Sequence, residues 1–137
     1  MLANTVALLC FSMCVPPPAG TNVDGMLDAI RIVETGGLRD PNNAVGDNGK
    51  AIGAYQIHYA YWKDAVDYDP SIGGKYSDCK DPKYARRIVR SYLSRYVPKG
   101  GWSIDTVSRI HNGGPKGHTK SATRKYAEKV KNNYGSV

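Results

Sequence analysis

The chain of 137 residues is poor in cysteine, with only Cys10, Cys14 and Cys79. Two of these lie in an apolar N-terminal stretch, so the remainder holds one thiol and can form no internal disulfide. A small domain of this kind must be stabilised by its hydrophobic core. Cys79 lies in the polar segment 76–82, which is typical of a turn before a helix, and we do not assign it as a nucleophile.

Acidic residues are also scarce. The chain has 12 Asp and Glu against 19 Lys and Arg, which gives a formal net charge of +7, and its only glutamates are Glu34 and Glu128. Such a charge favours anionic partners, namely bacterial walls, anionic membranes or nucleic acid. Charge alone does not choose among them.

Motifs for metal, nucleotide and serine chemistry are missing. The three histidines, His58, His111 and His118, lack the spacing of metal ligands, and no cysteine pair accompanies them. No glycine-rich phosphate loop follows a predicted strand, and no serine occupies a recognisable nucleophile motif. We therefore expect no metal and no cofactor. Basic helix faces like the one that contains Arg86 and Arg87 are usually solvated surface, so we expect no nucleic-acid partner.

The first twenty residues contain no Asp, Glu, Lys or Arg. An apolar run over 5–15 is followed by Pro16, Pro17, Pro18 and small residues, which is the layout of a secretory signal peptide. The run is too short to span a membrane. We expect a signal peptide over 1–20, a secreted product and a catalytic domain over 21–137. The alternative is an apolar tail packed on the domain.

Apolar spacing predicts about five helices around one short hairpin, an α+β, mainly α fold. The first helix is expected from Asp24 as its cap to Glu34, where Gly36 and Gly37 stop it. Further helices are expected over 53–67, from Asp81-Pro82 to Pro98, from Ser103 to Asn112, and from Thr119 or Ser121 to Tyr134. The turn Asp47-Asn48-Gly49 predicts a hairpin between 44–45 and 50–52.

Two carboxylates stand out as candidates for chemistry. Glu34 closes an apolar helix, where the helix dipole disfavours an acid, so its position calls for another reason. Asp47 lies in a polar turn with backbone donors and water available. Cleavage of a glycosidic bond needs such a pair, one protonated acid in an apolar pocket and one ionised carboxylate in a polar setting. The simpler alternatives are a solvated charge for Glu34 and a turn residue for Asp47.

This interpretation makes geometric demands. Glu34 and Asp47 must line the same groove, and the reversal needed for this is expected at Gly36, Gly37 and Pro41. Glu34 should be the more buried of the two, and desolvation should raise its pKa so that it holds its proton. If Asp47 pointed away, Asp40 would be the next carboxylate to examine.

Several segments resemble the invertebrate-type lysozymes, the destabilase family. They are, in order, Val33–Gly37, Asp47–Ile57, Tyr61–Asp64, Ser77–Cys79, Tyr92–Tyr96 and Arg109–Gly117. The resemblance covers about residues 26–132. The most specific part is His111-Asn112-Gly113-Gly114-Pro115 at its distance from Tyr55-Gln56-Ile57.

The resemblance implies a lysozyme-like fold and a muramidase activity on the β-1,4 bonds of peptidoglycan, by a monomer that is not inserted in a membrane. The family's acid falls on Glu34 and its second carboxylate on Asp47. The resemblance also implies a set of residues near the substrate: Tyr55, Gln56, His58, His111 and Asn112.

The chain departs from the family in two respects. The interval from Asp47 to Gln56 is one residue shorter, and the family's many disulfides are missing, Cys79 matching a normally paired position. Three other functions stay open. They are a catalytically weak lysozyme-like module that binds peptidoglycan, an isopeptidase activity as in some family members, for which no nucleophile can be mapped, and a cationic antimicrobial that acts by charge.

The cysteine content gives a first prediction. A reducing agent should leave the Tm unchanged, because Cys79 has no intrachain partner once residues 1–20 are removed. Thermal unfolding with and without reductant measures this. A lower Tm in reductant would mean that an intermolecular disulfide forms, or that Cys10 or Cys14 is retained.

Overall fold

The structure is a computed structural model that describes residues 16–135. Most of the expected signal peptide therefore lies outside the described residues. Among those described, no helix is both long enough and apolar enough to cross a membrane.

Five α-helices form most of the described chain, as the sequence predicts. Their bounds are α1 Val23–Thr35, α2 Tyr59–Tyr68, α3 Pro82–Tyr96, α4 Ile104–Gly113 and α5 Arg124–Tyr134. Short 3-10 helices connect them at Pro41–Asn43, Asp47–Gly49, Pro70–Ile72, Tyr76–Lys80, Gly117–Thr119 and Ser121–Thr123.

The sheet is small and antiparallel, in the order β1-β2-β3. Strand β1 Val45–Gly46 pairs with β2 Ala51–Ile52, which confirms the predicted hairpin. Strand β3 Ile57–His58 pairs with β2 on its other side and was not predicted. The hairpin thus supplies two of the three strands, and the register of β2 with β3 places Ile57 opposite Ile52.

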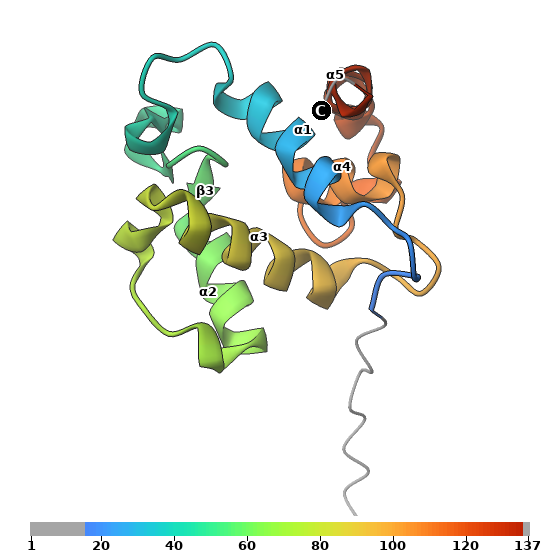
Figure 1. Cartoon of the computed structure of the whole chain (residues 1–137), viewed down its shortest axis with the longest axis horizontal. Helices are drawn as coiled ribbons and strands as arrows, with labels where there is room; N and C mark the ends of the chain where they lie inside the picture. The colour runs from blue at the N-terminus through green and yellow to red at the C-terminus, as the bar shows by residue number, and fades with distance from the viewer. Residues whose placement is uncertain (1–15, 136–137) are drawn as a thin grey trace, which may run out of the picture.

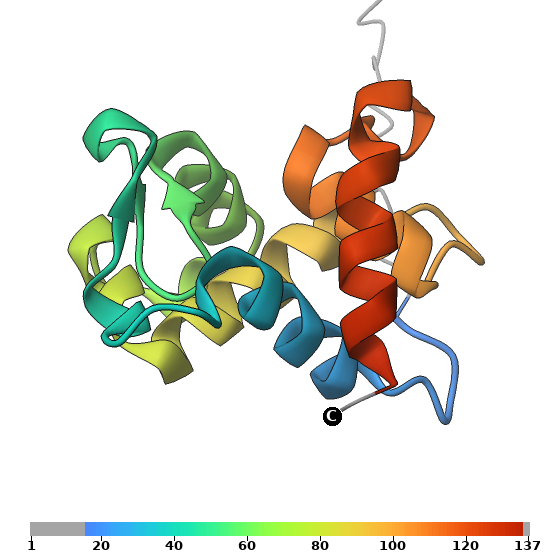
Figure 2. The ribbon, with the colours of Figure 1, turned by 90° about the horizontal axis from the view of Figure 1, so that it is seen from above.

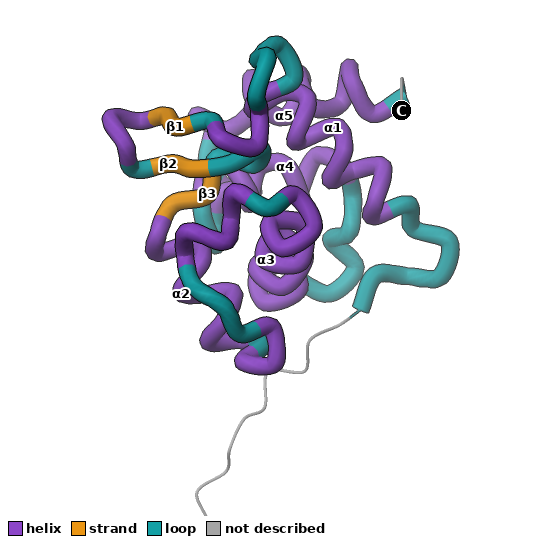
Figure 3. The backbone as a smooth tube through the Cα atoms, turned by 60° about the vertical axis from the view of Figure 1, so that its left-hand side comes forward, coloured by secondary structure: helices purple, strands orange, loops and turns teal. Residues whose placement is uncertain are grey.

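The helices surround the core in two groups. Helix α5 packs against α1 and α4, and α2 packs against α3. Figure 1 shows the sheet beside α2, and Figure 2 shows α1 and α3 running between this part and the pair α4 and α5. Figure 3 shows the three strands at one end of the molecule. The core between these elements includes fully buried residues of α1, α3, α4 and α5: Leu27, Ile30, Ile88, Leu93, Val107, Ile110 and Val130.

Helix starts were predicted with mixed success. Asp81 caps α3, with Pro82 in its first turn, and Ser103 caps α4, as expected. The expected cap Asp24 is wrong. Asn22 caps α1 instead, because its Oδ1 accepts from the backbone N–H of Gly25 at 2.9 Å. The last helix begins at Arg124, later than Thr119 or Ser121.

The predicted helix over 53–67 begins too early. Residues 53–56 form a turn, 57–58 form β3, and only then does α2 begin. Gly53 and Gln56 both have positive φ, at 77° and 50°, which a right-handed α-helix does not allow. The aromatic spacing continues across this stretch, but pairing of β3 with β2 is a tertiary interaction that the local pattern does not contain.

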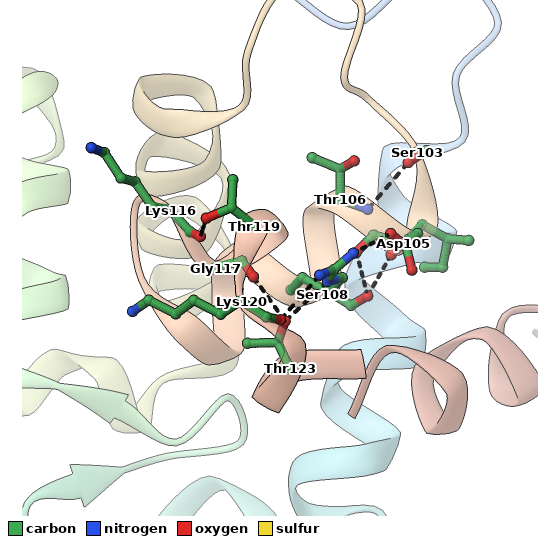
Figure 4. A network of polar contacts seen from close by, with 11 residues as sticks. Ser103, Asp105, Thr106, Ser108, Lys116, Gly117, Thr119, Lys120 and Thr123 are labelled. Atoms are coloured by element: carbon green, nitrogen blue, oxygen red, sulfur yellow. Dashed lines mark hydrogen bonds and ion pairs between the residues drawn. The ribbon is translucent and has the colours of Figure 1, made fainter. Parts of the chain in front are cut away.

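A polar network joins α4 to the start of α5 (Figure 4). The Thr123 hydroxyl donates to the carbonyl oxygens of Gly117 and Lys120, both at 2.8 Å. Arg109 of α4 donates from Nε to the Thr123 hydroxyl at 3.0 Å and from Nη2 to the Lys120 carbonyl at 3.0 Å. These bonds fix the orientation of α5 relative to α4. They therefore also position the side chains of α5 that face α1.

The close approach of Gly117 to α4 gives a second prediction. A Cβ at Gly117 would lie 1.9 Å from the Arg109 carbonyl oxygen, so Gly117→Ala forces a backbone shift. We expect a loss of about 1–3 kcal/mol in the free energy of unfolding, measured by urea denaturation. Gly37→Ala is the control, because a Cβ there meets nothing within 4 Å and its stability should be unchanged or slightly higher. Equal stabilities of the two variants would contradict this account.

Candidate active site

Glu34 lies in the last turn of α1, and a buried hydrogen bond fixes the end of that helix. The hydroxyl of Thr35 donates to the Ala54 carbonyl at 2.8 Å, which ties α1 to the turn before β3. The helix ends at Thr35, and Gly36 follows it with ordinary right-handed backbone angles, φ −62° and ψ −20°. The carboxylate of Glu34 is therefore presented at the point where the helical part meets the sheet.

The Glu34 carboxylate is held by two side chains from other helices. The Tyr126 hydroxyl of α5 donates to Glu34 Oε1 at 2.7 Å. The Nε2 atom of His111, in the last turn of α4, lies 3.5 Å from the same oxygen. His111 is itself buried, so the acid has a fixed basic neighbour.

His111 is oriented by a further tyrosine. The Tyr61 hydroxyl of α2 and His111 Nδ1 are 2.9 Å apart, within hydrogen-bond distance. Tyr61 in turn stacks on Tyr92 of α3, with ring centroids 3.6 Å apart and the planes 14° from parallel. Burial raises the pKa of both the Tyr61 and the Tyr126 hydroxyls, so they act as neutral groups.

The surroundings of Glu34 correct one expectation. Glu34 is the more buried carboxylate, as predicted, with its side chain 19% exposed against 58% for Asp47. Its pKa, however, is lowered and not raised. Burial raises the pKa, but the contact with His111 and its charge, the Tyr126 hydrogen bond and the charge of His58 together outweigh burial.

Asp47 begins the turn between β1 and β2. Its φ is 49°, and Asn48 and Gly49 follow with φ of 54° and 86°. Asp and Asn tolerate this left-handed conformation better than most residues, which explains their presence in the turn. The Asp47 carboxylate faces outward, 3.3 Å from His58 Nε2.

His58 connects the two carboxylates. It pairs with Asp47 at 3.3 Å, and its charge also lowers the pKa of Glu34. The imidazole, at the end of β3, therefore lies within electrostatic range of both acids.

The remaining predicted substrate contacts divide into surface and interior residues. Asn112 is exposed beside His111. Gln56 is half-buried, and its Nε2 donates to the Gly53 carbonyl at 3.0 Å, so it stabilises the turn before β3. Tyr55 is 1% exposed and belongs to the core, which leaves no side-chain surface there for a sugar. Asp40 caps the 3-10 helix Pro41–Asn43 through the Asn43 backbone N–H.

Two other chemistries find no site in the described residues. Burial raises the pKa of the Cys79 thiol to about 12, so it stays protonated and unreactive near neutral pH. No group of three or more His, Cys, Asp or Glu side chains within the described range could hold a metal ion.

The sequence interpretation missed Tyr61 and Tyr126 as partners of the site. Both occur at helical apolar spacing and were assigned to apolar helix faces or to the family pattern. Nothing local distinguishes them from core tyrosines, since their hydroxyls find Glu34 and His111 only after the helices pack.

The chain is similar to proteins of one known family. The profile of the Destabilase family matches residues 28–133. The chain is 38% identical over 88 residues to the lysozyme of Ostrea edulis, covering 62% of this chain and 61% of that protein. It is 36% identical over 86 residues to lysozyme 1 of Crassostrea virginica, covering 61% of this chain and 45% of that protein. These matches thus span about half to three fifths of the length of the oyster lysozymes.

Solved structures show the same fold. The Tapes japonica lysozyme superposes with a TM-score of 0.64 and 29% identity, over 77% of this chain and 85% of that one. A chain in the complex of Aeromonas hydrophila PliI with Meretrix lusoria lysozyme also gives 0.64, with 28% identity over 79% and 87%. The fold is therefore lysozyme-like, as the sequence predicts.

The contacts of Glu34 give a third prediction. Tyr126→Phe removes the donor that favours the ionised carboxylate, so the pKa of Glu34 should rise, which a ¹³C NMR titration of its carboxyl carbon measures. At neutral pH the variant should lose about 1–2 kcal/mol in the free energy of unfolding. A carboxyl with a lowered folded pKa stabilises above its unfolded pKa, and this is lost as pH falls through the folded pKa. The difference between variant and wild type should therefore vanish in acid.

Tyr134→Phe is the control, because Tyr134 lies on the same helix and no bond to Glu34 depends on it. It should leave the Glu34 pKa unchanged. An unchanged Glu34 titration in Tyr126→Phe would show that the hydroxyl does not hold the carboxylate.

Proposed function

Since the chain belongs to the destabilase family of invertebrate-type lysozymes, we propose that it is a muramidase that hydrolyses the β-1,4 glycosidic bonds of bacterial peptidoglycan. The observation that supports this most directly is the carboxylate of Glu34, largely buried at the end of α1 between His111 and Tyr126. Such a carboxyl group, fixed in position and shielded from water, suits a general acid.

The environment of Glu34 must change when the substrate binds if Glu34 is to act as an acid. In the free protein the contacts of His111, Tyr126 and His58 lower its pKa. A sugar chain over the site excludes water, and desolvation disfavours the charged carboxylate. Glu34 then takes up a proton and delivers it to the glycosidic oxygen.

Asp47 acts as the ionised partner. Its side chain is 58% exposed in a polar turn, and His58 Nε2 lies 3.3 Å from it, so the carboxylate is open to a substrate. It stabilises the positive charge that develops on the sugar, or attacks it, when the bond to the leaving oxygen breaks. His58 is exposed beside Asp47 and Asn112 is exposed beside His111, so both could bind sugar hydroxyls, whereas Gln56 stabilises the turn before β3 and Tyr55 belongs to the core.

The net charge of the protein suggests where this activity takes place. The net charge of +7 draws the protein to anionic bacterial walls, which suits an antibacterial or digestive enzyme that is secreted and acts as a monomer. Its partner is the peptidoglycan polysaccharide, and it needs no cofactor.

A second candidate is a lysozyme-like protein that binds peptidoglycan without cutting it. The lowered pKa of Glu34 favours this candidate, because an acid that is ionised in the free protein lacks the proton that cleavage requires. Binding would then depend on the exposed side chains and the positive charge alone.

Glu34→Gln tests the proposal. The amide keeps the shape of the side chain but cannot donate an acidic proton, so clearing of a wall suspension should slow by about 10²–10⁴-fold. Glu128→Gln, at the only other glutamate, removes the same charge on the exposed face of α5 and should keep wild-type activity. Asp47→Asn should also slow clearing.

Sedimentation with insoluble walls separates the two candidates. A muramidase clears the suspension, and its Glu34→Gln variant still sediments with walls. Wild-type protein that sediments with walls without clearing them supports the binding protein. A Glu34→Gln variant that keeps more than about a tenth of the wild-type rate rules out Glu34 as the acid.

A further inference from the structure

A cavity with cationic residues in its lining lies away from the contacts of Glu34. This cavity of about 590 Å³ is bordered by α1, α3 and the turn before β3. Five cationic side chains line it: Arg31, Lys83, Arg86, Arg87 and Arg90. None of the side chains that contact Glu34 or Asp47 lines this cavity.

The positive charge of the cavity is only partly balanced. Asp24 lines it and pairs with Arg86 at 3.3 Å and with Arg90 at 3.0 Å, and Asp28 also pairs with Arg86. In the part of the chain that the structure describes, no carboxylate forms an ion pair with the other three cations, Arg31, Lys83 and Arg87. The cavity therefore has an excess of positive charge.

Tyr55 is a buried part of the lining. It borders the cavity but is 1% exposed, so its hydroxyl is closed to a ligand. Burial raises the pKa of this hydroxyl, and the charges of Arg86, Asp28 and Arg31 also act on it. A ligand in the cavity would therefore contact the cationic side chains and not the tyrosine hydroxyl.

The chemistry of the lining selects the ligand. Arginine guanidinium groups match phosphate oxygens in a two-pronged geometry, and a phosphate group has enough oxygens to accept from two arginines at once. A carboxylate has only two oxygens for the same donors. The cavity is also larger than one phosphate, which leaves room for the molecule that carries it. We infer that this cavity binds the phosphate group of a phosphate ester, with Arg31 and Arg87 as its main contacts.

The ion pairs of Asp24 limit the affinity. Asp24 neutralises part of Arg86 and Arg90, and its side chain is 66% exposed, so its removal should not disturb the core. Asp24→Asn should therefore bind phosphate more tightly than the wild type. A gain in affinity cannot result from misfolding, which makes this variant the strongest arm of the test.

The experiment is a calorimetric and NMR titration of the full domain with inorganic phosphate at an ionic strength of about 0.15 M. The wild type should bind one phosphate saturably. The double variant Arg31→Gln with Arg87→Gln should bind at least about tenfold more weakly, and Asp24→Asn several-fold more tightly. None of these readouts depends on wall hydrolysis.

A matched control removes the same charge elsewhere. Lys129→Gln with Lys131→Gln, on the exposed surface of α5, should leave phosphate affinity unchanged. Loss of affinity equal to that of the arginine pair would show that only net charge matters, and would overturn the site. Absence of saturable binding by the wild type, or no gain in Asp24→Asn, would also overturn it.

A second ligand tests whether the cavity binds a phosphate ester and not only inorganic phosphate. Glycerol 3-phosphate should bind at least as tightly as inorganic phosphate, because the cavity can hold the glycerol as well. Binding about tenfold weaker than that of inorganic phosphate would overturn the assignment to an ester.

Discussion

The largely buried carboxylate of Glu34 is the constraint on which the rest of the structure depends. A charge in a small core is unfavourable unless other groups donate to it, and here the groups that contact it come from α4 and α5 and are supported by α2 and α3. Tyr126 of α5 and His111 of α4 contact the carboxylate, Tyr61 of α2 contacts His111, and Tyr92 of α3 stacks on Tyr61. The five helices must therefore be packed correctly before the Glu34 carboxylate has these contacts.

The same requirement explains the polar ties at the edges of the core. Thr35 fixes the end of α1 to Ala54, and Arg109 with Thr123 fixes the start of α5 to α4. Cys79, the only cysteine that the structure describes, is a free buried thiol, so no disulfide within 16–135 holds these elements together. Hydrogen bonds at the ends of the helices hold these elements together instead.

Much of the fold could be predicted from local patterns. The five helices, the cap of α3 at Asp81 and the turn at Asp47 follow from apolar spacing and from the residues that start or stop elements. The strand β3 could not be predicted, because residues 57–58 are strand only through pairing with β2. The burial order of Glu34 and Asp47 was also predictable, since one closes an apolar helix and the other lies in a polar turn.

The sequence by itself determined which residues could do chemistry, since it contains only two glutamates and one of them ends an apolar helix. The resemblance to a family added the second carboxylate. Only the tertiary structure decided the electrostatics of Glu34. Burial raises a carboxyl pKa, and the sequence supports that expectation, but His111, Tyr126 and His58 reverse it from positions distant in the chain. A pKa depends on distances between side chains, and those distances exist only once the helices have packed.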